Sequence, residues 1–329
     1  IFSIIELLEM DSADVVLSIL QVVNQITSDN TAVLESLCYI GALPIIGQLA
    51  NRTQPPAVRT EVCHFLKNLL VKCQPQTTAS DKFNLLDMFV LANGMKALVH
   101  LLSLPSGVAG MSAEQHVFDQ CRICLQTAID AIHQILTQKL RVAQKDLCVL
   151  LVVNYVGEPL SQATALFLKD PKTPPAFTDK VLQVWGFLTA STARGQSADV
   201  RYRLSTEAVL HRLFECIELL SPKDKVQLLH CILHLAQCPD QGNISKAGCI
   251  RELIKVLDWV LGVRPSSDPI LLEIEDVVLL SLYHLTKVNS CKVNLRQAAD
   301  AGIVPHLKRL VERGGTPVTR AIPMLYEMI

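Results

Sequence analysis

Two short groups of cysteine and histidine residues are the first candidates for chemistry in this sequence. The first group is the C-x-x-C pair Cys121 and Cys124. A zinc site built on such a pair needs further ligands, and a redox site needs a strand-to-helix setting. The pair lies instead within a helical pattern of apolar residues, which favours a structural role for both thiols.

The second group is His230, His234 and Cys238, whose spacing of four residues puts three side chains on one face of a helix. These residue types can bind zinc. The zinc-protease pattern with histidines at this spacing also needs a glutamate directly after the first histidine, and Cys231 occupies that position. We therefore interpret the row as the polar edge of a helix that lines a groove.

The sequence contains no motif of a kinase, nucleotide-binding or hydrolase site. It has no Gly-rich phosphate loop, no kinase catalytic loop and no G-x-S-x-G turn. We predict that this chain is not itself an enzyme, and that it has no catalytic residues, no cofactor and no metal.

Composition narrows the class of protein further. The chain has 329 residues, of which 50% are hydrophobic and 5% aromatic, as expected for many similar helices with an aliphatic core. Its 30 basic and 31 acidic residues balance, which argues against a nucleic-acid partner. No apolar run reaches the ~20 residues of a membrane span, and 11 scattered cysteines suit reduced thiols in the cytoplasm. The chain starts without methionine and ends within an apolar segment, so we expect a piece of a longer protein.

A short corner pattern recurs along the chain: a helix ends at glycine, and an apolar helix follows, often through proline. Glycine can adopt the left-handed conformation that ends a helix, and proline suits the first turn of the next one. Four clear copies and two weaker ones put the marker residue at Gly41, Gly94, Gly157, Ala208, Gly248 and Gly302. Their spacing mostly exceeds the ~40–47 residues of an armadillo or HEAT unit, so most units carry insertions.

A longer amphipathic helix is expected upstream of the corners, at 58–71, 117–136, 179–190, 225–236 and 273–285. Ser221 and Pro222 indicate the start of one such helix, as its N-cap and its first residue. Surface loops rich in Pro, Gly, Ser or Thr are expected near 74–81, 103–113, 169–178, 191–199 and 262–269. We predict a single array of about six to seven repeats over residues 1–329.

These features predict an all-α fold, namely an α-solenoid superhelix of armadillo/HEAT-type repeats. A repeat of this kind cannot bury its apolar face alone, so neighbouring repeats stack and share a continuous core. We expect an elongated, curved body whose concave face binds proteins or extended peptides.

Several blocks of the sequence resemble one family of armadillo-repeat proteins. Residues 37–46, 86–94, 203–212, and 302–307 with 321–325, are similar to repeats in the non-catalytic part of the septation-initiation and mitotic-exit Ser/Thr protein kinases, including MAP kinase kinase kinase epsilon. The resemblance implies an ATP-dependent Ser/Thr kinase domain elsewhere in the parent protein. It also implies that the repeats act as a scaffold that localises or regulates the kinase in cytokinesis. The partners that it implies are a small GTPase or a spindle-pole scaffold, at the spindle pole or division site.

The resemblance also points to a row of binding residues. In armadillo proteins an asparagine near the end of the third helix faces the groove and binds the partner's backbone, since an amide has both donors and acceptors. The matching positions here are Gln25, Asn68, Gln134, Phe187, His234, His284 and Glu327. We take the six polar members as the candidate partner-binding groove. The other interpretation is a solvated stripe without a ligand.

Two other functions stay open: an unrelated armadillo adaptor, such as a peptide-cargo receptor or small-GTPase regulator, and an enzyme with a hidden site. A transport receptor should have tryptophans four residues before the row positions. This chain has no tryptophan there, but Gln21, His64, Asp130, Gln183, His230 and Leu280. That difference disfavours the transport receptor.

Overall fold

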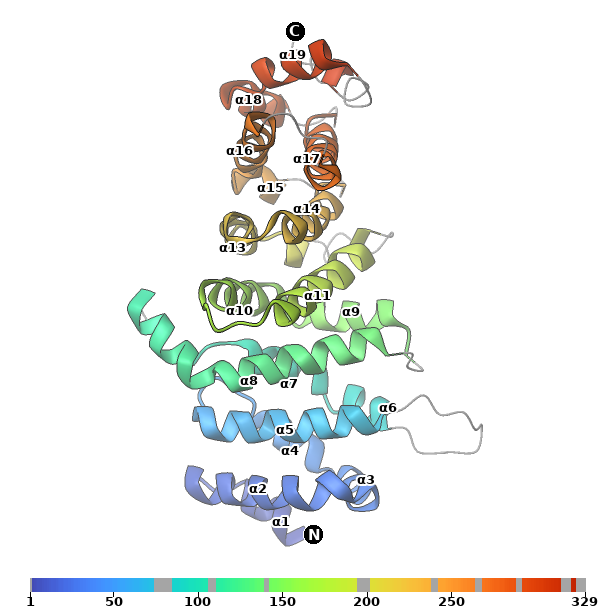
Figure 1. Cartoon of the computed structure of the whole chain (residues 1–329). Coiled ribbons are helices and arrows are strands. Elements are labelled where there is room, and N and C mark those ends of the chain that lie inside the picture. Colours follow the sequence, from blue (N-terminus) through green and yellow to red (C-terminus); the bar gives the residue numbers. More distant parts are fainter. Residues whose placement is uncertain are drawn as a thin grey trace. The chain divides into compact units, whose positions relative to one another are not determined.

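The computed structural model describes residues 2–73, 85–105, 111–138, 142–193, 202–237, 242–263, 268–287, 292–314 and 321–323. Throughout these ranges the regular structure is helical, with no strand (Figure 1). The predicted all-α fold is therefore confirmed, and the long helices stack within each unit as the predicted armadillo-type repeats require. The chain divides into two compact units, Ile1–Leu166 and Phe167–Ile329.

The first unit is built from repeats of a short helix, a second helix and a long third helix. Its long helices lie side by side, because α2 packs against α5 and α5 packs against α8 (Figure 1). The boundary between the units falls within the last of its helices. The helices are α1 (Phe2–Leu8), α2 (Ala13–Asp29), α3 (Thr31–Tyr39), α4 (Ala42–Gln48), α5 (Pro56–Lys72), α6 (Leu85–Leu91), α7 (Gly94–Leu102), α8 (Met111–Thr137), α9 (Gln144–Val153) and α10 (Gly157–Lys169).

The second unit repeats this arrangement. Its long helices α11, α14 and α17 pack one against the next. The helices are α11 (Pro175–Ala193), α13 (Glu207–Leu219), α14 (Pro222–Ala236), α15 (Gly242–Lys246), α16 (Cys249–Gly262), α17 (Pro269–Lys287), α18 (Lys292–Asp300) and α19 (Ile303–Arg313).

The five predicted long helices are confirmed as α5, α8, α11, α14 and α17, and every one is longer than expected. Ser221 is the N-cap of α14, as predicted: its hydroxyl accepts from the Asp224 amide at 3.3 Å, and Pro222 is the first residue of the helix. Three expected loops are shorter than predicted. The helix α8 already begins at Met111, within the loop expected at 103–113, and α11 occupies 175–193, which shortens the loops expected at 169–178 and 191–199. The expected loop at 74–81 lies outside the described residues.

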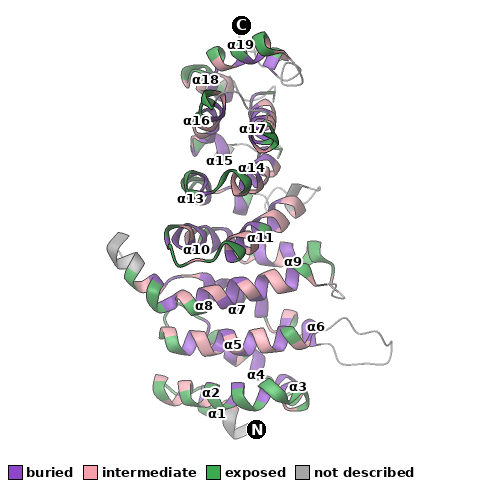
Figure 2. Cartoon of the chain, in the orientation of Figure 1, coloured by how far each residue is buried: buried purple, intermediate pink, exposed green. Residues whose placement is uncertain are grey.

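Buried positions recur along the long helices (Figure 2). Aliphatic side chains at spacings of three and four occupy these positions and form the core. In α5, for example, Val62, Phe65, Leu66 and Leu69 are each at most 1% exposed. All nine cysteines in the described ranges are buried in this core. Burial raises the pKa of five of their thiols to about 12, which keeps them protonated: Cys38, Cys73, Cys216, Cys231 and Cys249.

The corner between the first and second helix of a repeat has a left-handed residue in five places. Glycine occupies three of them, with φ of 88° at Gly41, 69° at Gly248 and 81° at Gly302. The prediction was wrong for the other two corners: the left-handed residues are Asn93 (φ 59°) and Tyr155 (φ 63°), not Gly94 and Gly157. Asparagine tolerates this conformation better than most residues, whereas tyrosine does not.

Gly94 has a different role from the predicted corner. It is the first residue of α7, and a Cβ at this position would lie 2.2 Å from the Phe89 ring. The corner expected at Ala208 is also wrong. There the chain turns through Thr206, an extended N-cap with φ −65° and ψ 151°, and Ala208 is already within α13. No left-handed residue is needed because the reversal is made by extended backbone.

A buried cation joins two neighbouring repeats of the first unit. Arg59 of α5 is completely buried, and its Nη2 donates to the carbonyls of His100, Leu101 and Ser103 at the end of α7, at 2.9, 3.2 and 2.5 Å. The last carbonyls of a helix have no partner within the helix and carry partial negative charge. Arg59 satisfies three of these acceptors with one charged donor.

Two residues of the second unit occupy the corresponding place in their long helices. Lys225 of α14 donates from Nζ to the Ile217 carbonyl in the last turn of α13, at 2.7 Å. Glu275 of α17 is buried and binds Arg313, in the last turn of α19, through two hydrogen bonds. In both units, therefore, a charged residue near the start of a long helix holds the end of a second helix.

No single helix in the described ranges is long and apolar enough to cross a membrane. Two bent pairs, α3 with α4 (85°) and α6 with α7 (69°), match a span by length and composition alone.

Replacing Gly94 by alanine should lower the free energy of unfolding by about 1–3 kcal/mol, because the new methyl group overlaps the Phe89 ring. Gly186 is the matched control. It lies within α11 with no atom within 4 Å of an added Cβ, so Gly186→Ala should stabilise the helix by about 0.5–1 kcal/mol. Urea unfolding measures both. Equal effects would contradict the close approach of Phe89.

Replacing Arg59 by methionine should destabilise the fold by about 2–3 kcal/mol, since three buried carbonyls lose a charged donor. The control is Arg52→Met on the exposed turn after α4, where a change within about 0.5 kcal/mol is expected. The unfolding midpoint in urea compares them. If the two variants had the same unfolding midpoint in urea, the contact of Arg59 with α7 would not stabilise the fold.

Candidate functional site

The structure places the described row residues at one equivalent position near the end of each long helix. Asn68 of α5 and Gln134 of α8 are half-buried, and a pair of buried residues follows each of them. These pairs are Leu69 with Leu70 and Ile135 with Leu136. Because the buried pair fixes the helix face against the core, the amide before it is held at the edge between core and solvent.

The second unit repeats this arrangement with rings instead of amides. Phe187 of α11, His234 of α14 and His284 of α17 are all half-buried, and each precedes two buried residues. Since α11 packs on α14 and α14 packs on α17, the three equivalent positions lie on successive neighbouring helices. The row in this unit therefore presents one benzene ring and two imidazoles.

Two predicted members differ from the rest. Gln25 of α2 is fully exposed, and Ile26 after it is 44% exposed, so the buried pair that fixes Asn68 has no counterpart there. Glu327 lies outside the described residues. The first unit thus brings together the amides of Asn68 and Gln134 on adjacent long helices, with Gln25 on the next helix more loosely held.

The two histidine rings of the row in the second unit contact neighbouring side chains. His234 Nδ1 lies 3.4 Å from the Thr189 hydroxyl, which links α14 to α11. The His284 ring lies edge-on to Tyr283, with centroids 5.9 Å apart, and Lys287 sits over the Tyr283 ring at 5.0 Å. Burial, and then the nearby Lys287 charge, lower the pKa of His284. His284 therefore presents a neutral imidazole at neutral pH.

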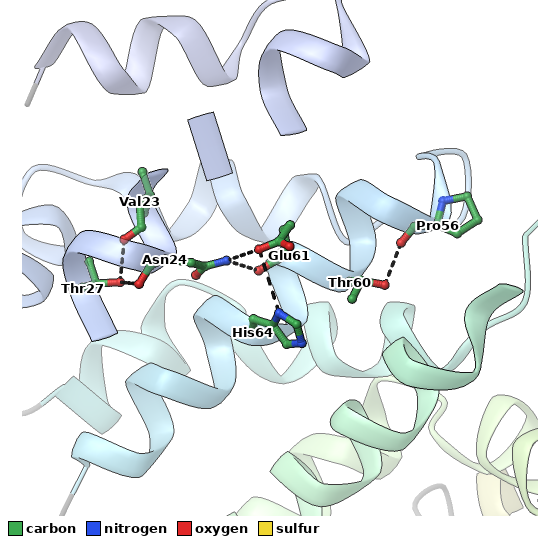
Figure 3. A network of polar contacts seen from close by, with 7 residues as sticks. All are labelled: Val23, Asn24, Thr27, Pro56, Thr60, Glu61 and His64. Atoms are coloured by element: carbon green, nitrogen blue, oxygen red, sulfur yellow. Dashed lines mark hydrogen bonds and ion pairs between the residues drawn. The ribbon is translucent and has the colours of Figure 1, made fainter. Parts of the chain in front are cut away.

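A carboxylate on α5 is the site residue that sequence reasoning missed. Asn24 of α2 donates from Nδ2 to the Glu61 carbonyl at 2.9 Å and to its carboxylate at 2.7 Å (Figure 3). His64, one turn further along α5, has its Nδ1 3.9 Å from the same carboxylate (Figure 3). Glu61 lies seven residues before Asn68, two turns along the same helix face, and that spacing is the signal that would have found it.

The described members of the two groups of metal-type residues form no ligand set. Cys121 and Cys124 are buried in α8, where Cys124 Sγ lies 3.8 Å from the Leu101 carbonyl. His230 contacts Glu273 at 3.3 Å, and Cys238 lies outside the described residues. Across the described ranges, no group of three or more His, Cys, Asp or Glu side chains is placed to hold a metal ion.

Two hollows open on the first unit. The larger, of about 810 Å³, lies among the α1–α2 turn, α4 and α7 and includes no residue of the row. The smaller, of about 580 Å³, lies between the N-terminal halves of α2, α5 and α8 and has Glu61 in its wall. It continues the face of the long helices that carries Asn68 and Gln134.

The sequence is similar to proteins of cell division. It is 23% identical over 317 residues to cytokinesis protein sepH of Aspergillus niger, covering 96% of this chain and 21% of the relative. It is 24% identical over 323 residues to cell division control protein 7 of Schizosaccharomyces pombe, covering 96% and 27%. The chain thus spans about a fifth to a quarter of these relatives' lengths.

A third relative is a plant protein kinase. The chain is 31% identical over 130 residues to MAP3K epsilon protein kinase 2 of Arabidopsis thaliana, covering 39% of this chain and 9% of the relative. Together the three relatives confirm the resemblance to septation and MAP3K epsilon kinases. No family model matches the chain. A designed armadillo repeat protein superposes with a TM-score of 0.49 and 17% identity, over 87% of this chain and all of that chain.

Stability should fall between pH 7 and pH 5, in part through His284. Its folded pKa is lowered, so the unfolded chain binds the proton more readily, and acid below about pH 6.5 favours unfolding. His284→Gln should reduce this pH dependence by less than the ~1.4 kcal/mol of one pKa unit, because the ring is partly solvated. Urea unfolding at both pH values measures it. An equal fall in variant and wild type would contradict the assignment.

Proposed function

We propose that this chain is the protein-binding repeat region of a septation- or cytokinesis-type Ser/Thr protein kinase, and that it acts without catalysis of its own. The observation that carries the proposal is the similarity to cell-division proteins along 96% of the chain. A kinase domain would then lie elsewhere in the parent protein, since the sequence of this chain has no kinase motif.

The long helices support a binding role. A repeat stack offers one side chain per repeat at equivalent positions, so an extended partner can meet a series of similar groups. Asn68 and Gln134 supply amides that can donate to and accept from a peptide backbone. His284 adds a neutral imidazole, and Phe187 adds an apolar ring at the equivalent position of another long helix.

The proposed role indicates where in the cell the protein acts and which class of partner it binds. A repeat region that localises a kinase in cytokinesis would act in the cytoplasm, at the spindle pole or the division site. Its partners would be proteins, for which a small GTPase and a spindle-pole scaffold are the candidates that the resemblance implies. The half-buried row suits such partners because each polar group is held in place by the buried pair behind it.

The test is a triple variant of the parent protein, Asn68→Ala, Gln134→Ala and His284→Ala, expressed in dividing cells. We expect the fluorescently tagged variant to be lost from the division site. Its affinity for the partner should fall about tenfold or more, which corresponds to ~1.4 kcal/mol of binding free energy. The melting temperature of the purified chain should change little, because all three side chains are half-buried and replaced by a good helix former.

The matched control changes three exposed residues of second helices, Gln48→Ala, His211→Ala and Lys308→Ala. These residues lie on α4, α13 and α19, away from the row. The control protein should still reach the division site. If both triple variants reached it equally, the row would not be the binding surface; if neither did, the loss would not be specific to the row.

A further inference from the structure

The smaller hollow of the first unit has walls of mixed chemistry. Leu17 of α2 and Pro55 and Pro56 at the start of α5 form its apolar part, and Gln21 and Gln120 reach it from α2 and α8. We call it the α5 groove. A surface with aliphatic and proline contacts beside a few polar groups is typical of a site for an extended peptide.

Glu61 is the one charged side chain among the described residues that line the α5 groove. Its side chain is only 19% exposed, so water screens the charge incompletely. Asn24 fixes the carboxylate with a hydrogen bond of 2.7 Å, and a second one of 2.9 Å holds the Glu61 carbonyl. Among its described lining residues, the groove therefore has a preoriented negative charge and no lysine or arginine.

The start of α5 supplies donors to the same groove. The first turn of a helix has amide groups without intrahelical partners. In α5, Pro55 and Pro56 have no N–H, so the donors of this turn are the amides of Ala57 and Val58, and no side chain caps the helix. Ala57 in this turn is exposed and lines the groove. A partner's carbonyl oxygen suits these amides, whereas a carboxylate or phosphate there would be repelled by Glu61 one turn further on.

We propose that the α5 groove binds an extended segment of a partner protein that places a lysine or arginine side chain on Glu61. The proposal rests on the proposed protein-binding function and names the chemistry of one partner segment. The cation forms a charge-assisted hydrogen bond to the carboxylate. Apolar or proline residues next to it pack on Leu17, Pro55 and Pro56, and the segment's backbone meets the amides of Gln21 and Gln120.

The experiment uses the immobilised chain and a random library of nine-residue peptides containing all twenty amino acids and phosphoserine. Retained peptides are sequenced by mass spectrometry. The wild-type chain should enrich lysine or arginine at one position, at least threefold over the library, with proline or aliphatic residues beside it. Enrichment of glutamate, aspartate or phosphoserine, or no charge preference at all, would overturn the proposal.

Two variants assign the effect to Glu61. Glu61→Gln keeps an oxygen that accepts from Asn24 but removes the charge, and it should abolish the enrichment of basic residues. Gln21→Arg leaves Asn24 and Glu61 intact, puts a competing cation in the wall of the groove, and should do the same. Unchanged enrichment in both variants would place the cation elsewhere and refute the proposal.

The control is Glu273→Gln on α17, which removes an exposed carboxylate from a long helix of the second unit. It should bind the library like wild type. The library result is also separable from the localisation test. The triple variant at Asn68, Gln134 and His284 leaves the lining of the α5 groove intact. If the library showed no preference for basic residues, but the triple variant still lost its localisation and Glu61→Gln kept it, only the proposal for the α5 groove would fail. The proposed protein-binding function of the row would stand.

Discussion

In the five repeats that have one, the left-handed residue at the end of the first helix is the constraint on which the rest of the repeat depends. One residue with positive φ lets the second helix start at a sharp angle without a loop, as in the 85° bend between α3 and α4. That angle decides which side of the second helix meets the long third helix. The conformation costs about 1–2 kcal/mol for a residue with a Cβ, yet Asn93 and Tyr155 adopt it. The packing that follows each corner therefore outweighs the local strain.

Charged residues near the start of three long helices also fix how the second and third helices of the repeats pack. Arg59, Lys225 and Glu275 each lie nine residues before a row position, Asn68, His234 and His284 respectively. Each holds the last turn of a second helix, directly or through an arginine. A long helix is thus fixed near its start by a charge and near its end by a buried pair. The long helix therefore cannot turn its row position away from the surface without breaking one of these contacts.

The sequence predicted what depends on local pattern. Apolar periodicity located the five long helices, and Ser221 with Pro222 located the start of α14, because those signals act within one or two turns. Tyr155 was missed because no local preference favours a left-handed tyrosine. Arg59 and Glu61 were missed for a different reason: their partners, the end of α7 and Asn24, lie 37 to 44 residues away. Only the stacking of helices brings these groups together, so single-sequence patterns do not reveal them.

The row itself shows why fold, rather than sequence spacing, defines a binding surface here. Its members are 66 residues apart from Asn68 to Gln134, but 47 from Phe187 to His234 and 50 from His234 to His284. The long helices themselves do not change with this spacing, since each of these five row residues still directly precedes two buried side chains. Insertions between helices change the connection and leave the helix register alone. The chemistry of the row can then differ between the units, amides in one and rings in the other, while its position in the repeat stays the same. A partner that follows either row meets equivalent positions of different chemistry, and this difference is the physical basis for specificity along a repeat stack.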